Sequence, residues 1–279
     1  MKVCGRRIEQ LYSEYKKTGR IPVLKTPGRP KKEITEHTRI TVKSYFEQYP
    51  MGAVSLEKII DNTHRIHIPH NTIHKIMANE GLAAREPSKS SRKRPWVRYE
   101  RTHSNSLWHT DYKLLDDGRW FIGYLDDASR FVTGYGVFEH ATTENAMMVL
   151  HKAIKEFGKP ASIMTDHGSQ FYSNESKSCQ KGPSQYEQEL VRLGIQQIMS
   201  GVRHPQTNGK TERFHGELQY RLHRFKGVDE LVRWYNYEKP HRSLNWDNLE
   251  TPARAFKRKM PSVGTTVIDA ESGEIYDVS

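Results

Sequence analysis

The sequence predicts an α/β fold, in which a mixed five-stranded sheet is flanked by helices and preceded by an all-helical region. Two observations lead to this prediction. From Leu107 onward, strand-like and helix-like runs follow one another in the order βββ-α-β-α-β-α, which is typical of a sheet with helices on its faces. Before Leu107, residues 35–82 show only the helical spacing of apolar residues. Short basic segments without an apolar period separate the regions.

The amino-terminal segment, residues 1–23, is predicted to contain one helix over residues 1–19. Its apolar residues recur at helical spacing, and the pattern ends at Gly19. The apolar face would consist of Ile8, Leu11, Tyr12 and Tyr15. Because the helix starts almost at the first residue, we interpret this segment as part of a truncated first helix-turn-helix unit.

Two basic segments are predicted to be linkers. Residues 24–34 are rich in Pro, Gly and Lys, and Gly28-Arg29-Pro30 resembles an AT-hook, which would lay Arg29 in the minor groove of DNA. A plain flexible linker is the alternative for this segment. Residues 84–106 form the second linker, which we interpret as a phosphate-contacting tether rather than a nuclear localisation signal. The contacts of this tether would come from Arg92, Lys93 and Arg94.

Residues 35–83 are predicted to form a helix-turn-helix domain from three short helices. In the third helix, Ile73, Ile76 and Met77 would face the core. Four histidines between residues 64 and 74 also raise a zinc site as an alternative, which we disfavour because no Cys lies nearby. The side chains left for the major groove of DNA are His70, Asn71, His74 and Lys75.

Positive charge is concentrated in the amino-terminal part of the chain. Residues 1–100 carry 21 of the 44 Lys and Arg residues but 10 of the 33 Asp and Glu residues, so they account for the whole formal net charge of +11. Clustered positive charge is typical of proteins that bind nucleic acid, because neutralising phosphates releases counterions. We therefore predict DNA binding rather than a merely soluble basic surface.

Composition excludes several other classes of protein. No run approaches the roughly 18 apolar residues of a membrane span, and the first residues lack the apolar stretch of a signal peptide. Cys4 and Cys179 are the only cysteines, which excludes a disulfide framework and a Cys-rich zinc site. We expect a cytoplasmic, nucleoid-associated protein of prokaryotic type that has no membrane partner.

The α/β region is predicted to begin with an antiparallel three-stranded meander, because short turn sequences such as Asp116-Asp117-Gly118 separate its first strands. The first helix that follows ends at Gly158. The predicted strands span residues 107–115, 120–127, 130–139, 161–166 and 195–200, and the predicted helices span residues 142–158, 184–194 and 208–225.

Three acidic residues are predicted to meet at one edge of this sheet. Asp111 lies within the first strand, Asp166 ends the fourth, and Glu212 opens the final helix. If the first and fourth strands are neighbours, the two Asp side chains emerge together and the helix can bring Glu212 to them. Carboxylates so placed repel one another, and hard divalent cations such as Mg²⁺ relieve that repulsion. Two such ions suit an in-line displacement at phosphorus.

A second acidic pair, Asp126-Asp127, is interpreted as a turn rather than a catalytic pair, because it follows a strand and precedes Ala128-Ser129. A contact between Asp127 and Arg130 is expected in that turn. Asp111 differs from this pair, because Asp is disfavoured inside an apolar and aromatic strand.

The final helix adds two features around its acid. Gly216 lies on the same polar stripe as Glu212 and removes bulk beside it. Lys210 and Arg213 flank the acid, and we predict that they contact DNA phosphates together with His204 in the preceding loop.

Five segments of the chain follow one another in an order that resembles a known family. They are LWHTDYKLL, TDHGSQF, HPQTNGKTERFHGELQ, YNYEKPHRSLN and TPARAF. These segments resemble the catalytic core of insertion-sequence DDE transposases, the retroviral-integrase type, over residues 107–257, which leaves residues 258–279 as a tail. The resemblance implies an RNase H-like fold with Asp111, Asp166 and Glu212 as the catalytic, metal-binding triad. Asp166 and Glu212 lie further apart in sequence than is usual in the family, and residues 174–185 are the expected surface insertion.

The family resemblance also implies an activity. It implies a transposase that binds the terminal inverted repeats of its element and joins them to target DNA. Each active site would use two Mg²⁺ ions, with Mn²⁺ as the alternative, and the protein would act as a homo-oligomer assembled on DNA. Two other functions stay open: a helix-turn-helix regulator with an inactive core, and an RNase H-like nuclease acting on RNA-DNA hybrids or junctions.

Overall fold

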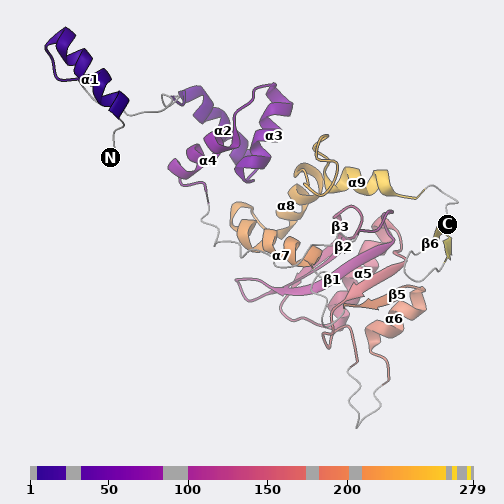
Figure 1. Cartoon of the computed structure of the whole chain (residues 1–279). Coiled ribbons are helices and arrows are strands. Elements are labelled where there is room, and N and C mark those ends of the chain that lie inside the picture. Colours follow the sequence, from indigo (N-terminus) through magenta and orange to yellow (C-terminus); the bar gives the residue numbers. More distant parts are fainter. Residues whose placement is uncertain are drawn as a thin grey trace. The chain divides into compact units, whose positions relative to one another are not determined.

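The computed structural model of the chain describes residues 5–22, 33–83, 100–173, 182–200, 209–261, 266–268 and 275–277. The chain divides into two units, Met1–Pro87 and Ser88–Ser279, and each is considered by itself (Figure 1). Among the described helices, none is long and apolar enough to cross a membrane. Some predicted features lie outside the described residues: Arg29, Arg92, Lys93, Arg94, His204, both cysteines and most of the insertion.

The first unit contains the predicted helices. They are α1 (Gly5–Thr18), α2 (Glu36–Gln48), α3 (Ala53–His64) and α4 (His70–Asn79). None of the residues of α1 is buried by the described part of the chain, so its predicted apolar face is mostly exposed. In contrast, α2, α3 and α4 share a hydrophobic core, which makes them a folded unit.

Local sequence signals explain the limits of α2, α3 and α4. The Thr35 side chain caps α2 by accepting a hydrogen bond from the Thr38 amide. Arg65 ends α3 in the left-handed conformation, and Pro69 precedes α4. The core face predicted for α4 is confirmed, because Ile73, Ile76 and Met77 are all buried.

The polar side chains of α4 lie on its outer surface. His70, Asn71, His74 and Lys75 are exposed, as the helical spacing predicts. His70 Nδ1 lies 3.0 Å from Glu57 Oε2 of α3, and His67 Nε2 lies 3.7 Å from Glu57 Oε1. Across the described ranges, no group of three His, Cys, Asp or Glu side chains is arranged to hold a metal ion.

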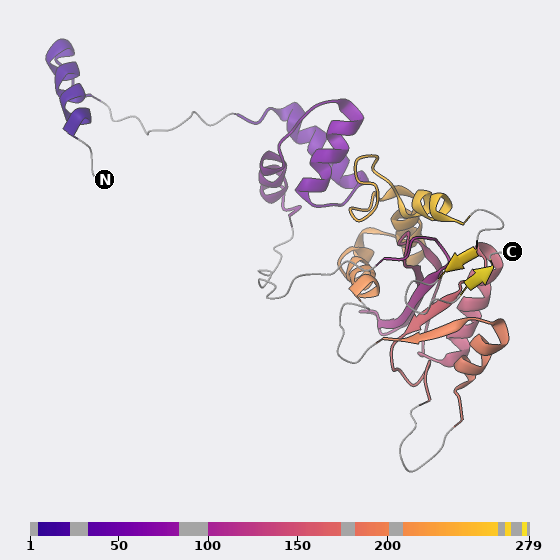
Figure 2. The same ribbon diagram turned by 45° about the vertical axis from the view of Figure 1, so that its right-hand side comes forward.

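The second unit is built on a mixed five-stranded sheet with the strand order β3-β2-β1-β4-β5 (Figures 1 and 2). Strand β1 pairs antiparallel with β2, and β2 pairs antiparallel with β3. Strand β1 also pairs parallel with β4, and β4 pairs parallel with β5. This arrangement is the RNase H-like fold, so the predicted fold is confirmed. The strands are β1 (Leu107–Leu114), β2 (Trp120–Asp126), β3 (Val132–Phe138), β4 (Ser162–Thr165) and β5 (Gln196–Met199).

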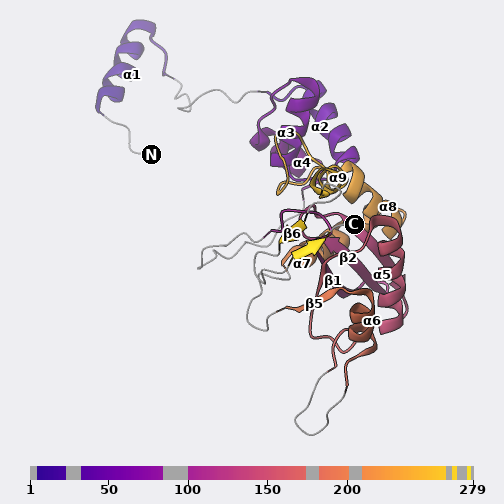
Figure 3. The same cartoon turned by 90° about the vertical axis from the view of Figure 1, so that its right-hand side faces the viewer.

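Helices cover the two faces of the sheet. On one face lie α5 (Thr143–Phe157) and α6 (Gln185–Leu193) (Figure 3). The hydrophobic core on this face includes Trp108, Tyr124 and Leu150. Side chains alternate along a strand, so Phe121 points to the opposite face, where its ring contacts Phe214 of α7 (Gly209–Arg221). The sequence predicts that this helix reaches residue 225. In the structure its α-helical part ends at Arg221, and a 3-10 turn (Leu222–Arg224) follows.

Near the carboxyl-terminal end of the chain, residues of the last helix contact residues that precede β1. A helix α8 (Val228–Arg233), a π-helical turn (Trp234–Glu238) and α9 (Pro252–Lys259) follow α7, and a hairpin of β6 (Thr266–Ile268) and β7 (Ile275–Asp277) comes last. Ser104 Oγ donates a hydrogen bond to the Phe256 carbonyl at 2.9 Å, and Lys259 Nζ lies 2.8 Å from Glu100 Oε1. Residues just before β1 thus contact residues of α9.

A matched pair of Gly→Ala substitutions tests the backbone of this domain. Gly158 ends α5 with φ of 88° and ψ of 166°, a region essentially restricted to Gly, so Gly158→Ala is expected to lower the free energy of unfolding by about 1–3 kcal/mol. Gly216 lies inside α7 with nothing within 4 Å of an added Cβ, so Gly216→Ala is expected to raise it by about 0.5–1 kcal/mol. Urea unfolding of both variants measures the two changes in the free energy of unfolding. Changes in the same direction would contradict the different backbone conformations described for Gly158 and Gly216.

Candidate active site

The three predicted acids come from neighbouring elements of the second unit. Asp111 lies in the middle of β1, Asp166 directly follows β4, and Glu212 lies in the first turn of α7. In the parallel pairing of β1 with β4, His109 lies beside Met164, so the same register carried two residues further places Asp111 beside Asp166. Helix α7 packs on β1. The strand neighbours that the prediction required are therefore present.

The acids influence one another electrostatically. The pKa of Asp111 is raised from 3.8 to about 7, first because the side chain is buried and next because Asp166 and Glu212 place negative charge near it. A backbone hydrogen bond at Tyr112 and the charge of Lys113 only partly oppose this rise. The charges of Asp166 and Glu212 thus reach Asp111. Among the described residues, however, no group of three His, Cys, Asp or Glu side chains is arranged to hold a metal ion.

The loop after β4 fixes the orientation of Asp166. Its carboxylate accepts a hydrogen bond from the Gly168 amide at 2.9 Å. A Cβ at Gly168 would lie 2.9 Å from Asp166 Oδ1, so a larger residue there would require the carboxylate to shift. Glu212 is exposed on α7 and has no such constraint. The candidate ligands are therefore three carboxylates, from β1, the end of β4 and α7, and carboxylate oxygens are the hard ligands that suit Mg²⁺.

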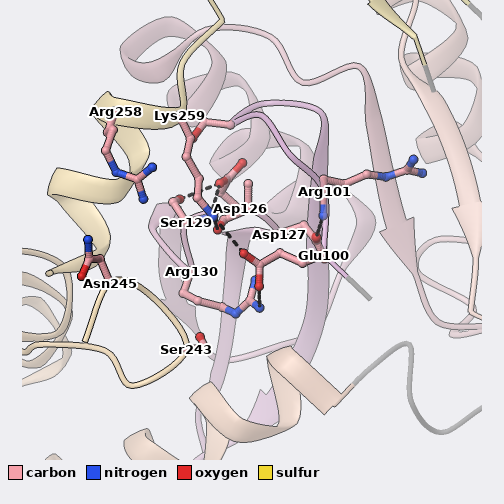
Figure 4. A network of polar contacts seen from close by, with 12 residues as sticks. Glu100, Arg101, Asp126, Asp127, Ser129, Arg130, Ser243, Asn245, Arg258 and Lys259 are labelled. Atoms are coloured by element: carbon pink, nitrogen blue, oxygen red, sulfur yellow. Dashed lines mark hydrogen bonds and ion pairs between the residues drawn. The ribbon is translucent and has the colours of Figure 1, made fainter. Parts of the chain in front are cut away.

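The pair Asp126-Asp127 has two different roles. Asp126 ends β2, and its side chain stabilises the turn that follows: its Oδ2 accepts hydrogen bonds from the Ser129 amide at 2.9 Å and from Ser129 Oγ at 2.5 Å. The predicted contact between Asp127 and Arg130 is wrong, because Arg130 instead pairs with Glu100 at 2.9 Å. Glu100 also pairs with Lys259, and Figure 4 shows this network beside the turn.

Asp127 is a fully buried carboxylate that the sequence did not identify as important. His109 Nε2 lies 2.6 Å from its Oδ1, and the ammonium of Lys210 contacts the same oxygen. Burial acts to raise the pKa of Asp127, but its hydrogen bond from His109 and the charge of Lys210 hold that pKa well below its usual value. The available sequence signal was weak: an acid after a strand, a His in the partner strand and a Lys far along the chain.

The two basic residues of the first turn of α7 have different surroundings. Lys210 pairs with Asp127 and keeps 15% of its side chain exposed, and burial lowers its pKa to about 8 despite that pairing. Arg213 is exposed. Of the predicted phosphate contacts in this helix, Arg213 therefore has a free approach, whereas Lys210 is already engaged within the protein.

Further along α7, Glu217 links the helix to the segment that follows it. Glu217 Oε1 lies 2.5 Å from Lys239 Nζ, and its other oxygen contacts Arg221. Lys239 is 5% exposed, and its ammonium lies 5.6 Å and 5.0 Å from the ring centroids of Trp234 and Tyr235. The YNYEKPH segment thus supports the helix that carries Glu212, a role that sequence reasoning did not predict.

The strand order of the sheet is that of the RNase H-like fold. Residues 101–205 and residues 193–248 each match a family model described as an integrase core domain. The first segment contains Asp111 and Asp166, and the second contains Glu212. The chain therefore carries an integrase core domain.

Similar proteins cover only parts of the chain. "Putative integrase ORF3" of Spiroplasma virus SpV1-C74 is 31% identical over 154 residues, which is 48% of this chain and 42% of that protein, so the chain spans less than half of this relative. An uncharacterized protein of Archaeoglobus fulgidus is 32% identical over 110 residues, 39% of this chain and 84% of that protein. The HTLV-2 integrase catalytic core domain, solved in complex with magnesium, is 16% identical with a TM-score of 0.42, over 55% of this chain and 97% of that chain.

Proposed function

We propose that this protein is a DDE transposase of an insertion sequence. The observation that carries the proposal is that Asp111, on an integrase core domain, has a pKa raised to about 7, first by burial and then by the nearby charges of Asp166 and Glu212. Acidic groups kept together at such an electrostatic cost are typical of functional sites. The polynucleotidyl-transfer chemistry expected of integrase cores needs an acid cluster of this kind.

The three acids would hold divalent metal, two Mg²⁺ ions per active site or Mn²⁺ in their place. Bound metal would activate the attacking oxygen and stabilise the leaving oxygen at phosphorus. Asp111 and Asp166 would contribute ligands from the sheet, where strand pairing and the Gly168 amide limit their motion. Glu212 would contribute its ligand from α7.

The reaction would proceed in two displacements at phosphorus. Water first attacks the phosphodiester at the element end, and the bond that breaks leaves a free 3′-hydroxyl. That hydroxyl then attacks a phosphodiester of target DNA, forming the new bond as a target 3′-oxygen leaves. Neither displacement requires a covalent protein intermediate. Two element ends need two active sites, so a homo-oligomer assembled on DNA is part of the proposal.

The first unit would bind the terminal inverted repeats. Its α4 presents Asn71, His74 and Lys75 on an exposed face above a buried core, which suits a helix that enters the major groove. Arg213 on α7 would contact phosphates near the active site. Arg29, His204 and the basic segment with Arg92, Lys93 and Arg94 are proposed as further contacts with DNA.

A strand-transfer assay tests this function directly. The DNA on either side of the gene is first searched for inverted repeats, and labelled duplexes of those ends are incubated with the full chain, Mg²⁺ and plasmid. Covalent joining of an end 3′-hydroxyl to the plasmid is expected. Specific binding of the ends without joining would favour the alternative, a regulator with an inactive core. Preferential cleavage of an RNA-DNA hybrid or a four-way junction would favour a nuclease.

A further inference from the structure

We infer that Lys210 is a positioning residue: by pairing with the buried carboxylate of Asp127, it holds the first turn of α7 so that Glu212 faces Asp111. The inference rests on the proposed metal-dependent function. It replaces the direct phosphate contact that the sequence suggests for Lys210 with a structural role acting through Glu212.

The carboxylate of Asp127 joins three parts of the domain. Its Oδ2 accepts a hydrogen bond from the backbone amide of Arg101, just before β1, at 2.6 Å. Its Oδ1 accepts one from His109 Nε2, within β1, also at 2.6 Å. The Lys210 ammonium, from α7, reaches the same Oδ1. Because Asp127 is fully buried, this junction lies inside the protein and ties α7 to the sheet.

Lys210 supplies the charge that a buried carboxylate requires. An unpaired buried charge is strongly destabilising, so Asp127 needs a cation beside it. The ammonium of Lys210 contacts Asp127 Oδ1, whereas the guanidinium of Arg130 pairs with Glu100 instead. The cation in contact with Asp127 is therefore Lys210.

The geometry connects this ion pair to the acids. Side chains alternate along β1, so His109 and Asp111 lie on the same face, two residues apart. Glu212 also follows Lys210 by two residues, but in the helix α7 this spacing has a different effect. Thr211, whose side chain is buried, lies between them. At about 100° per residue, Lys210 and Glu212 leave opposite flanks of the helix. Anchoring Lys210 on one flank fixes the rotation of the first turn and hence the direction of Glu212.

A phosphate-contacting role fits Lys210 less well. Its side chain is 15% exposed and already paired, so reaching a phosphate would break the contact with Asp127 and leave that carboxylate buried without its cation. Arg213, in the same turn, is exposed and can meet phosphates without such a loss.

The test compares metal binding with DNA binding in the full-length protein. The variants are Lys210→Gln, Lys210→Arg and Asp127→Asn/Lys210→Gln, with Lys152→Gln on the exposed side of α5 as the matched control. Mn²⁺ binding is followed by electron paramagnetic resonance without DNA. Affinity for element-end DNA is measured without metal over a series of salt concentrations.

Lys210→Gln is expected to weaken Mn²⁺ binding about 10–100-fold, the usual loss when a residue that orients a metal ligand is removed. Its DNA affinity and salt dependence should match those of Lys152→Gln. Lys210→Arg, which keeps the charge, should recover most of the Mn²⁺ binding. Wild-type Mn²⁺ affinity together with a salt slope reduced by about one would overturn the inference in favour of a phosphate contact.

Two further outcomes are also decisive. If Lys210→Gln does not fold, the double variant decides, because it leaves no unpaired buried charge: weakened Mn²⁺ binding supports the inference, and wild-type binding overturns it. If the wild-type protein itself binds no Mn²⁺, the proposed metal-dependent function fails and the inference fails with it. Normal Mn²⁺ binding by both wild type and variants would remove the inference alone.

Discussion

Replacing Asp166 by Asn is expected to reduce Mg²⁺-dependent joining of element-end DNA about a thousandfold. A metal ion contributes several kcal/mol of transition-state stabilisation, and each 1.4 kcal/mol corresponds to about tenfold in rate. Asn keeps the size of the side chain and one oxygen but loses the negative charge that holds the metal. Single-turnover joining at saturating DNA measures the loss in the chemical step.

The same substitution should leave DNA binding intact. Asp166 lies next to β4 in the second unit, whereas the residues proposed to read DNA sequence lie on α4 of the first unit. Affinity for the element ends, measured without metal, should therefore stay within about twofold of wild type. Asp116→Asn, which alters an exposed carboxylate in the turn after β1, is the matched control. If both variants join DNA at the same rate, Asp166 has no place in the active site.

The fold followed from short-range patterns in the sequence. Strand-like runs separated by turn sequences predicted β1, β2 and β3, and the helix-like run that ends at Gly158 predicted α5. The position of Asp111 beside Asp166 also followed once β1 and β4 were taken as neighbours, because parallel strands carry their register forward. These features depend on residues close in sequence or on one choice of strand order.

The contacts missed from the sequence join residues far apart along the chain. Asp126-Asp127 reads as a turn, and only the packing of α7 against β1 shows that Asp127 is buried and paired with Lys210. The ion pair of Lys259 with Glu100 likewise joins residues separated by more than half of the chain. A charged residue looks the same in the sequence whether it contacts solvent, DNA or a buried partner. Its partner can therefore be identified only from the folded structure.

Replacing Asp111 by Asn is expected to make the metal-free protein more stable at pH 8. The pKa of this carboxyl group is about 7 in the folded protein, against an ordinary value of 3.8, so folding disfavours its ionised form. The folded state therefore binds the proton more tightly, and wild-type stability falls as the pH rises from about 4 to about 7. Asn removes the charge, and the expected gain above pH 7 is about 2 kcal/mol after allowing for partial solvent screening.

Urea unfolding in the presence of EDTA at pH 4 and pH 8 measures this effect. The two proteins should be equally stable at pH 4, where Asp111 is largely protonated, and should diverge at pH 8. Asp117→Asn is the control, because Arg119 lowers the pKa of that exposed carboxylate, and removing it should bring no gain at high pH. Equal stability of wild type and Asp111→Asn at pH 8 would mean that the acids do not crowd one another. A gain in stability combined with loss of Mg²⁺-dependent joining would instead indicate that the chain keeps an unfavourable, partly buried acid for its chemistry. Metal binding would then offset the repulsion among the three carboxylates.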